Sequence, residues 1–139
     1  MITLDELLDG NDYESLSPEI HANLQELLIR INKVRAAWGK PMIVNSGLRT
    51  MEHHIEIYKD KAKREGKVFN IKKVPMKSRH LRGQAVDISD PKRELQKWCS
   101  ANVTLLESVG LWMESFVFTK TWCHFQINPP QSGRRFFMP

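Results

Sequence analysis

The chain has 139 residues, a formal net charge of +5 and 41% hydrophobic residues. This length suits one domain, residues 1–139, and the apolar fraction suffices for a core without disulfide bonds. No segment approaches the roughly 20 apolar residues of a membrane-spanning helix, which excludes helical membrane spans. The acidic N-terminus lacks the basic start of a signal peptide, so we expect synthesis in the cytoplasm without an export signal. Cys99 and Cys123 lack metal-site spacing and are expected to be free thiols.

The first part of the chain carries the patterns of two helices. Thr3 can cap a short helix that ends at Leu8. Ser17 can cap a longer helix, which Gly39 would end. Apolar residues recur at helical spacing along one face of this second helix: Ile20, Leu24, Leu27, Leu28, Ile31, Val34 and Trp38.

A short strand and a third helix follow. Residues 42–45 read as a strand that leads into a Ser-Gly-Leu-Arg segment. Thr50 can cap a helix that Gly66 would end. Its expected apolar stripe consists of Met51, Ile55, Tyr58 and Ala62. Residues 67–79 then form a long polar loop.

The second half of the chain alternates strands with short helices. Three strands are expected, at residues 84–88, 111–114 and 122–127. Asp90 can cap one helix, and residues 103–109 form another before a glycine. The tail is expected to be non-regular and to wrap the domain through Phe136 and Phe137. These elements predict an α+β fold, in which helices surround a small antiparallel sheet.

The segment from Ser78 to Asp87, Ser-Arg-His-Leu-Arg-Gly-Gln-Ala-Val-Asp, is the most informative part of the chain. It offers His80 and Asp87, and the later segment Trp-Cys-His-Phe-Gln adds His124. Two imidazoles and one carboxylate are the ligands of a catalytic zinc site, whose fourth position stays open for water. Side chains alternate along a strand, so we expect Asp87 and His124 to face the same cleft.

These residues carry a resemblance to a known family. Ser-x-His-x-x-Gly-x-Ala-x-Asp with a late Trp-x-His resembles the zinc D-alanyl-D-alanine carboxypeptidase and L-alanyl-D-glutamate endopeptidase family of peptidoglycan peptidases. Hedgehog N-terminal domains share its fold. The segment Ser-Gly-Leu-Arg that ends at Arg49 is similar to a further motif of the family, so the resemblance covers residues 17–128. It implies one Zn²⁺ bound by His80, Asp87 and His124, and hydrolysis of peptidoglycan stem peptides.

The resemblance also implies roles in substrate binding. Arg49 matches the arginine that binds substrate and supports the transition state, and Ser78 matches the serine that contacts the substrate carboxylate end. Trp122 is expected to form a wall of the cleft beside the metal. The structural alternatives are an ion pair for Arg49 and a turn-stabilising hydroxyl for Ser78.

One position departs from the family pattern. The family places its catalytic glutamate three residues before the last histidine, where this chain has Thr121. A hydroxyl cannot act as a general base at neutral pH. The nearest upstream carboxylate is Glu114, which a hairpin would set close to Trp122 and within reach of the metal. Glu114 is therefore either the replacement base or a solvated acid at a strand end.

The sequence is also compatible with functions other than that of a cellular peptidase. The small size resembles phage endolysins of the family, which act on the cell wall of the host, and a monomer is expected. A zinc-binding structural or virion protein that has lost catalysis is the alternative that Thr121 favours. The basic run at residues 59–77 lacks a recognisable DNA-binding motif, so we expect no nucleic-acid partner.

Overall fold

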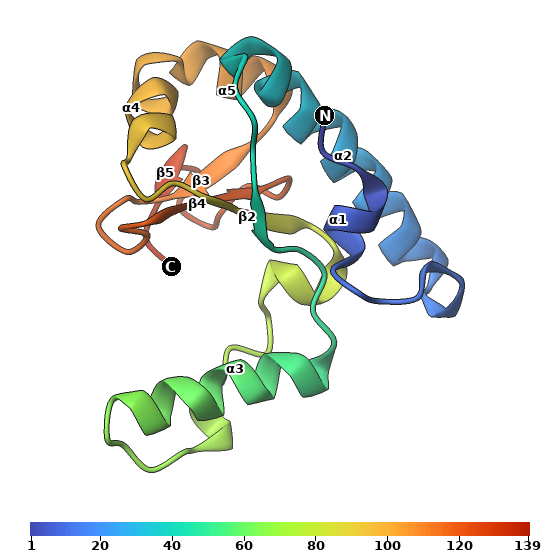
Figure 1. The fold of residues 1–139 in the computed structure, drawn as a ribbon, viewed down its shortest axis with the longest axis vertical. Helices are drawn as coiled ribbons and strands as arrows, with labels where there is room; N and C mark the ends of the chain where they lie inside the picture. Colours follow the sequence, from blue (N-terminus) through green and yellow to red (C-terminus); the bar gives the residue numbers. More distant parts are fainter.

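A five-stranded mixed sheet lies at the centre of the structure, a computed structural model that describes residues 1–139 (Figure 1). The strands are β1 (Val44–Ser46), β2 (Ala85–Ser89), β3 (Trp112–Glu114), β4 (Trp122–Gln126) and β5 (Phe136–Phe137). They are ordered β1-β2-β4-β3-β5. Five α-helices accompany the sheet, which confirms the α+β class.

The prediction of a purely antiparallel sheet and a non-regular tail is wrong at one edge. β5 pairs with β3 in parallel, with Phe136 opposite Met113 and Phe137 opposite Glu114. The other pairs are antiparallel. Two consecutive aromatic residues suit a pleated, half-buried edge, which explains why the tail ends in a strand.

Capping side chains set the starts of the first three helices as predicted. The helices are α1 (Leu4–Leu8), α2 (Pro18–Trp38), α3 (Met51–Arg64), α4 (Glu94–Ala101) and α5 (Val103–Val109). Thr3, Ser17 and Thr50 each accept a hydrogen bond from a first-turn amide. The prediction that Asp90 caps α4 is wrong, because that helix begins four residues later. Asp90 nevertheless accepts hydrogen bonds from the backbone amides of Leu95 and Gln96, so its carboxylate still satisfies the first turn.

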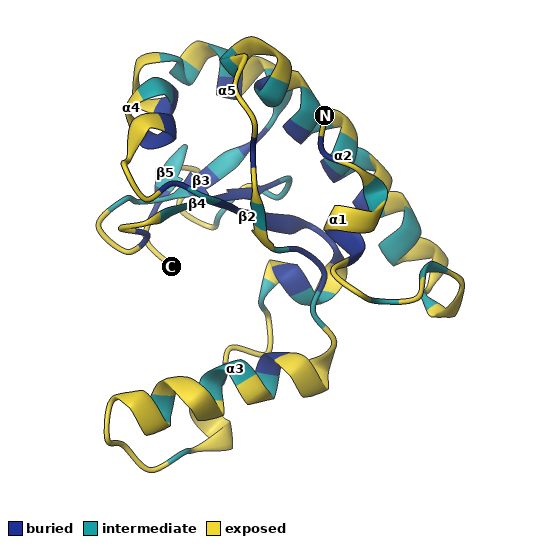
Figure 2. Cartoon of the chain, viewed as in Figure 1, coloured by how far each residue is buried: buried dark blue, intermediate teal, exposed yellow.

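One face of the sheet builds the hydrophobic core. The core joins sheet residues that include Val86, Ile88, Met113, Cys123 and Phe125 to apolar residues of α1, α2, α4 and α5. Figure 2 shows these buried segments between the helices and the sheet. Because side chains alternate along strands, the residues between them project from the opposite face, which these helices leave uncovered.

The segment of residues 51–77 stands apart from this body, and we call it the α3 lobe (Figure 1). It consists of α3 and the loop that returns from it. Only His54 and Val74 are buried in the lobe. Of the apolar stripe expected on α3, Met51 is 44% exposed, whereas Ile55, Tyr58 and Ala62 are half-buried. None of these four residues belongs to the hydrophobic core of the body.

Candidate metal centre and substrate cavity

Strand register aligns three functional side chains on the uncovered face of the sheet. Asp87 on β2 pairs with His124 on β4. On the other side of β4, Met113 pairs with Phe125, so Glu114 is the next residue along β3 beside His124. Paired residues of antiparallel strands project from the same face. Asp87, His124 and Glu114 consequently form a row across three neighbouring strands.

His80 reaches the same row from outside the sheet. It lies in a 3₁₀ helix, Arg79–Arg82, that ends at Gly83, whose φ of 70° is in the left-handed region that favours glycine. The Nδ1 atom of His80 donates a hydrogen bond to the carbonyl of Gly47 at 2.9 Å. This bond fixes the tautomer and leaves Nε2, which lies 3.3 Å from Asp87 Oδ2, facing the row.

The position that accepts the hydrogen bond of His80, Gly47, has no room for a side chain. A Cβ atom at this position would lie 2.3 Å from the carbonyl oxygen of Leu7, too close for any side chain. The close approach is held by the Leu48 amide, which donates to that same oxygen at 2.8 Å. The N-terminal helix α1 therefore helps to place the carbonyl that orients His80.

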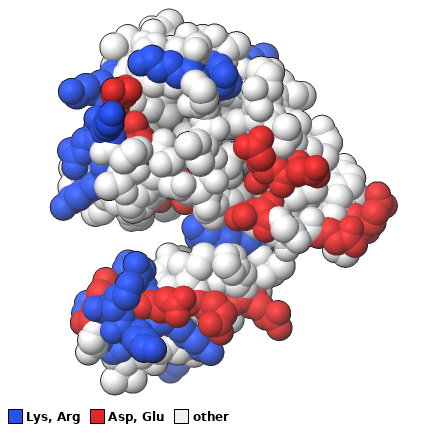
Figure 3. All heavy atoms as spheres, viewed as in Figure 1, with Lys and Arg blue, Asp and Glu red and all other residues white.

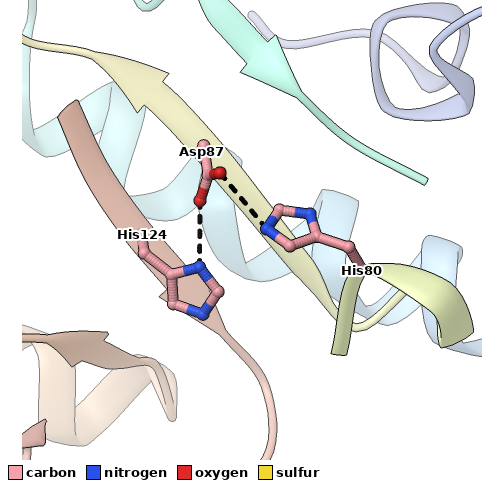
Figure 4. Close-up of side chains that lie close together, drawn as sticks. All are labelled: His80, Asp87 and His124. Carbon is pink, nitrogen blue, oxygen red and sulfur yellow. Dashed lines mark hydrogen bonds and ion pairs between the residues drawn. The ribbon is translucent and has the colours of Figure 1, made fainter. Parts of the chain in front are cut away.

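A chain of hydrogen bonds orients His124. The side-chain amide of Gln126 donates to the carbonyl of Asn128 at 2.9 Å, which turns its Oε1 atom toward His124. His124 Nε2 donates to that Oε1 at 2.8 Å, so Nδ1 faces Asp87 Oδ1 at 2.9 Å (Figure 4). A nitrogen lone pair and a carboxylate oxygen at this distance require a proton or a metal cation to share.

The protonation of this cluster follows from its contacts. Burial opposes the charged form of Asp87, but the charge of His80 and the hydrogen bonds of both imidazoles hold the pKa of Asp87 well below its usual value. Burial also opposes a charge on His124, but the hydrogen bond and charge of Asp87 raise the pKa of His124 above its usual value. A metal ion here would compete with a proton on His124.

The three side chains fit a zinc ion. One donor atom from each of His80, Asp87 and His124 lies within 4.8 Å of the other two. All three residues are buried, with exposures of 3%, 9% and 6%. Nitrogen and oxygen donors in this number suit a catalytic zinc, and both imidazoles have the outer hydrogen bonds that such ligands have. The structure thus brings together the three residues that the sequence analysis selected as ligands.

Glu114 lies at the edge of this cluster. Its Oε1 atom is 4.0 Å from His124 Nδ1, and its side chain is 23% exposed, so it is not a fully solvated acid. The β3–β4 register sets Glu114 beside His124, and Trp122 lies two residues earlier on the same face of β4. Thr121, the position of the missing family glutamate, is exposed before β4 begins.

Arg49 connects the cluster to a cavity. Its Nη2 atom lies 3.5 Å from Asp87 Oδ2, and its Nε donates to the Ser46 hydroxyl at 2.9 Å. The ion pair expected as the structural alternative is therefore present, and the same guanidinium also borders open space.

An open cavity of about 510 Å³ begins at Arg49. Trp122 lines it from the sheet, and the α3 lobe supplies Ile57, Tyr58, Lys61, Arg64 and Glu65. Figure 3 shows the hollow between the body and the lobe. None of these lobe residues was expected at the site, although their helical spacing places them on one face of α3. Ser78 does not line this cavity, and its hydroxyl makes no capping hydrogen bond.

The protein has an α+β fold and a buried His–Asp–His cluster on the open face of its sheet. This ligand set is typical of metal-dependent hydrolases. Residues 14–126 match the family model described as D-alanyl-D-alanine carboxypeptidase (VanY). The chain therefore belongs to this family, which confirms the resemblance and supports a carboxypeptidase-type function on peptidoglycan. No curated protein and no solved structure matches the chain. None of its helices is both long and apolar enough to cross a membrane.

Proposed function

We propose that the protein is a zinc-dependent peptidase that hydrolyses the D-alanyl-D-alanine bond of peptidoglycan stem peptides. The observation that carries this proposal is the buried cluster of His80, Asp87 and His124, with Glu114 at its edge, inside the residues that match the family. The D-Ala-D-Ala bond is preferred to L-Ala-D-Glu because the family description names the former.

His80 Nε2, Asp87 and His124 Nδ1 would hold the zinc. A bound zinc supplies Lewis-acid polarisation of the scissile carbonyl and activates water near neutral pH. The Gly47 carbonyl and Gln126 keep the two imidazoles in the tautomers that present these nitrogens.

Glu114 is the proposed general base. Its carboxylate would take a proton from the attacking water and pass it to the leaving amine as the C–N bond breaks, so the products are a shortened peptide and free D-alanine. Acid–base catalysis of this kind is typically worth about 10²–10⁴-fold. The position of Glu114 supports this role, because its Oε1 atom lies 4.0 Å from His124 Nδ1, the nitrogen that would bind the metal, and so the carboxylate borders the proposed site of the water.

Arg49, Trp122 and Ser78 are the proposed substrate-binding residues. Arg49 borders both Asp87 and the cavity, so its guanidinium is placed to stabilise the developing oxyanion. Trp122 forms the wall of the cavity on the side of the sheet. For Ser78 the support is the family motif and its place two residues before His80.

The test is digestion of a synthetic stem pentapeptide, followed by mass spectrometry. We expect loss of one alanine, with release stopped by a chelator and restored by zinc. Release of a fragment beginning with D-glutamate would instead show an endopeptidase. No cleavage by folded, zinc-loaded protein over a broad pH range would contradict the proposal.

A catalytically weakened zinc-binding protein is the second candidate, and Thr121 is the observation that favours it. Changing Thr121→Glu separates the two. If Glu114 is already the base, a second nearby carboxylate should not raise activity, since like charges raise one pKa. A large gain in Thr121→Glu, with no effect of Glu114→Gln, would favour the second candidate.

Other expectations stay predictions. The phage endolysin role with action on a host cell wall, the cytoplasmic synthesis, the single peptidase domain over residues 1–139 and the monomeric state are tested neither by the fold nor by the family match. Turbidity of sacculi exposed to the purified protein would test the lytic role.

A further inference from the structure

One face of α3 borders the cavity. The five lobe residues that line it are Ile57, Tyr58, Lys61, Arg64 and Glu65. Positions i, i+1, i+4, i+7 and i+8 lie along one face of a helix. Arg49 and Trp122 line the same cavity, and Arg49 also contacts Asp87, so this helix face is continuous with the candidate metal centre.

The charges on this face are unbalanced. Arg49, Lys61 and Arg64 are cations, whereas Glu65 is the one acid that lines the cavity. Glu65 Oε2 lies 3.4 Å from Lys67 Nζ, so its charge already has a partner. Neither Lys61 nor Arg64 forms an ion pair with any carboxylate of the protein.

The surroundings of the two cations favour an anionic ligand. Lys61 Nζ lies 5.8 Å from the centre of the Tyr58 ring, and Trp122 lines the same open cavity. Both cations are exposed, so a ligand in the cavity can reach them, and water partly screens the ion pair that forms. Arginine also suits the planar geometry of a carboxylate.

We propose that Lys61 and Arg64 bind a free carboxylate of the substrate peptide outside the bond that is cut, and so select acidic stem peptides. The inference rests on the proposed function for the nature of the substrate. The D-glutamate residue of a stem peptide carries such a carboxylate, which lies outside the bond that is cut. The cavity extends from Arg49 along α3, so a peptide seated at the metal centre can reach both cations.

Calorimetry of the full chain with a synthetic stem tetrapeptide, which lacks the scissile bond, tests this directly. The peptide is compared with a copy amidated at its D-glutamate. A copy amidated at its C-terminus is the control, because that carboxyl corresponds to the scissile carbonyl of the substrate. The proteins are the wild type, the double variant Lys61→Gln with Arg64→Gln, and the control Lys63→Gln. Lys63 lies on the same helix but does not line the cavity, so the control matches one of the two charge changes.

We expect the D-glutamate amide to bind about fivefold more weakly than the free acid, as partly exposed ion pairs allow. A loss of affinity confined to the C-terminal amide would place the contact at the cut bond and overturn the proposal. This preference should persist in Lys63→Gln and disappear in the double variant. Equal binding of all three peptides by the wild type, a preference that survives in the double variant, or no binding at all would overturn the proposal.

Cleavage of the pentapeptide, measured in parallel, separates this inference from the function on which it rests. An acid preference in binding without any cleavage would defeat the proposed peptidase and leave the carboxylate site intact. Cleavage with no preference between acid and amide would retain the peptidase and remove the role of Lys61 and Arg64.

Discussion

The body and the α3 lobe contribute to the candidate site in different ways. The body supplies His80, Asp87 and His124, all buried and tied to backbone or side-chain partners. The lobe supplies exposed side chains, and only two of its residues, His54 and Val74, are buried. Metal chemistry needs ligands held to a fraction of an ångström, whereas a substrate face can adjust to its ligand. We infer that the body sets the reaction and the lobe sets the choice of peptide.

The largest effect is expected from removing a ligand in the body. His124→Ala should abolish binding of about one zinc ion per chain, because two remaining ligands do not complete a catalytic site. Metal analysis after purification without added zinc measures this. His53→Ala is the matched control, since His53 is an exposed histidine of the lobe, and it should retain the metal. Equal zinc in both variants would contradict the assignment.

The next effect concerns Glu114, which borders the cluster. Glu114→Gln should keep the fold and the zinc but lower kcat by about 10²–10⁴-fold, because a carboxamide cannot accept the proton. Steady-state kinetics on the pentapeptide show whether the loss falls in kcat. Glu107→Gln, an exposed acid on α5, and Thr121→Ala should both be mild. Unchanged kcat in Glu114→Gln would exclude it as the base.

A smaller effect is expected from the outer hydrogen bond of His124. Gln126→Ala removes the acceptor that fixes the imidazole tautomer, and zinc affinity should fall about 10–100-fold. Competition with a zinc indicator measures this without reference to activity. Gln131→Ala, on the exposed tail, is the control. If the two variants bind zinc with the same affinity, Gln126 does not orient His124 for metal binding.

The smallest effect is expected in the lobe. His54 donates through Nε2 to the carbonyl of Pro75 at 2.7 Å, and so joins α3 to the returning loop. His54→Ala removes this bond, worth about 1 kcal/mol, and should raise KM roughly fivefold while zinc content and kcat stay the same. A loss of zinc in this variant would show that the lobe and the metal centre are not separable.

The sequence predicted the body better than the lobe, for physical reasons. Caps such as Thr3 and Ser17 act locally, so the starts of their helices follow from neighbouring residues. The ligand row followed from strand alternation and from the family motif. The start of α4 could not be predicted from neighbouring residues. Asp90 accepts hydrogen bonds from the first-turn amides across a turn that contains Arg93 in a left-handed conformation.

Two features could not be predicted from local sequence because they depend on long-range packing: the neighbour of Glu114, and the position of α3 outside the hydrophobic core. Strand register, which sets Glu114 beside His124, depends on pairing across a loop that sequence spacing does not fix. The apolar residues of α3 follow helical spacing, yet none of them belongs to the hydrophobic core of the body. Periodicity predicts a helix and its faces, but it does not state which face meets the body.

A crystal structure of the zinc-loaded protein tests the central assignment most directly. We predict zinc bound by His80 Nε2, Asp87 and His124 Nδ1, with Zn–N distances of about 2.0–2.1 Å, and the Glu114 carboxylate within hydrogen-bond reach of the open position. Zinc held by other residues, or Glu114 turned away from the open position with no other carboxylate near it, would contradict the proposed peptidase site.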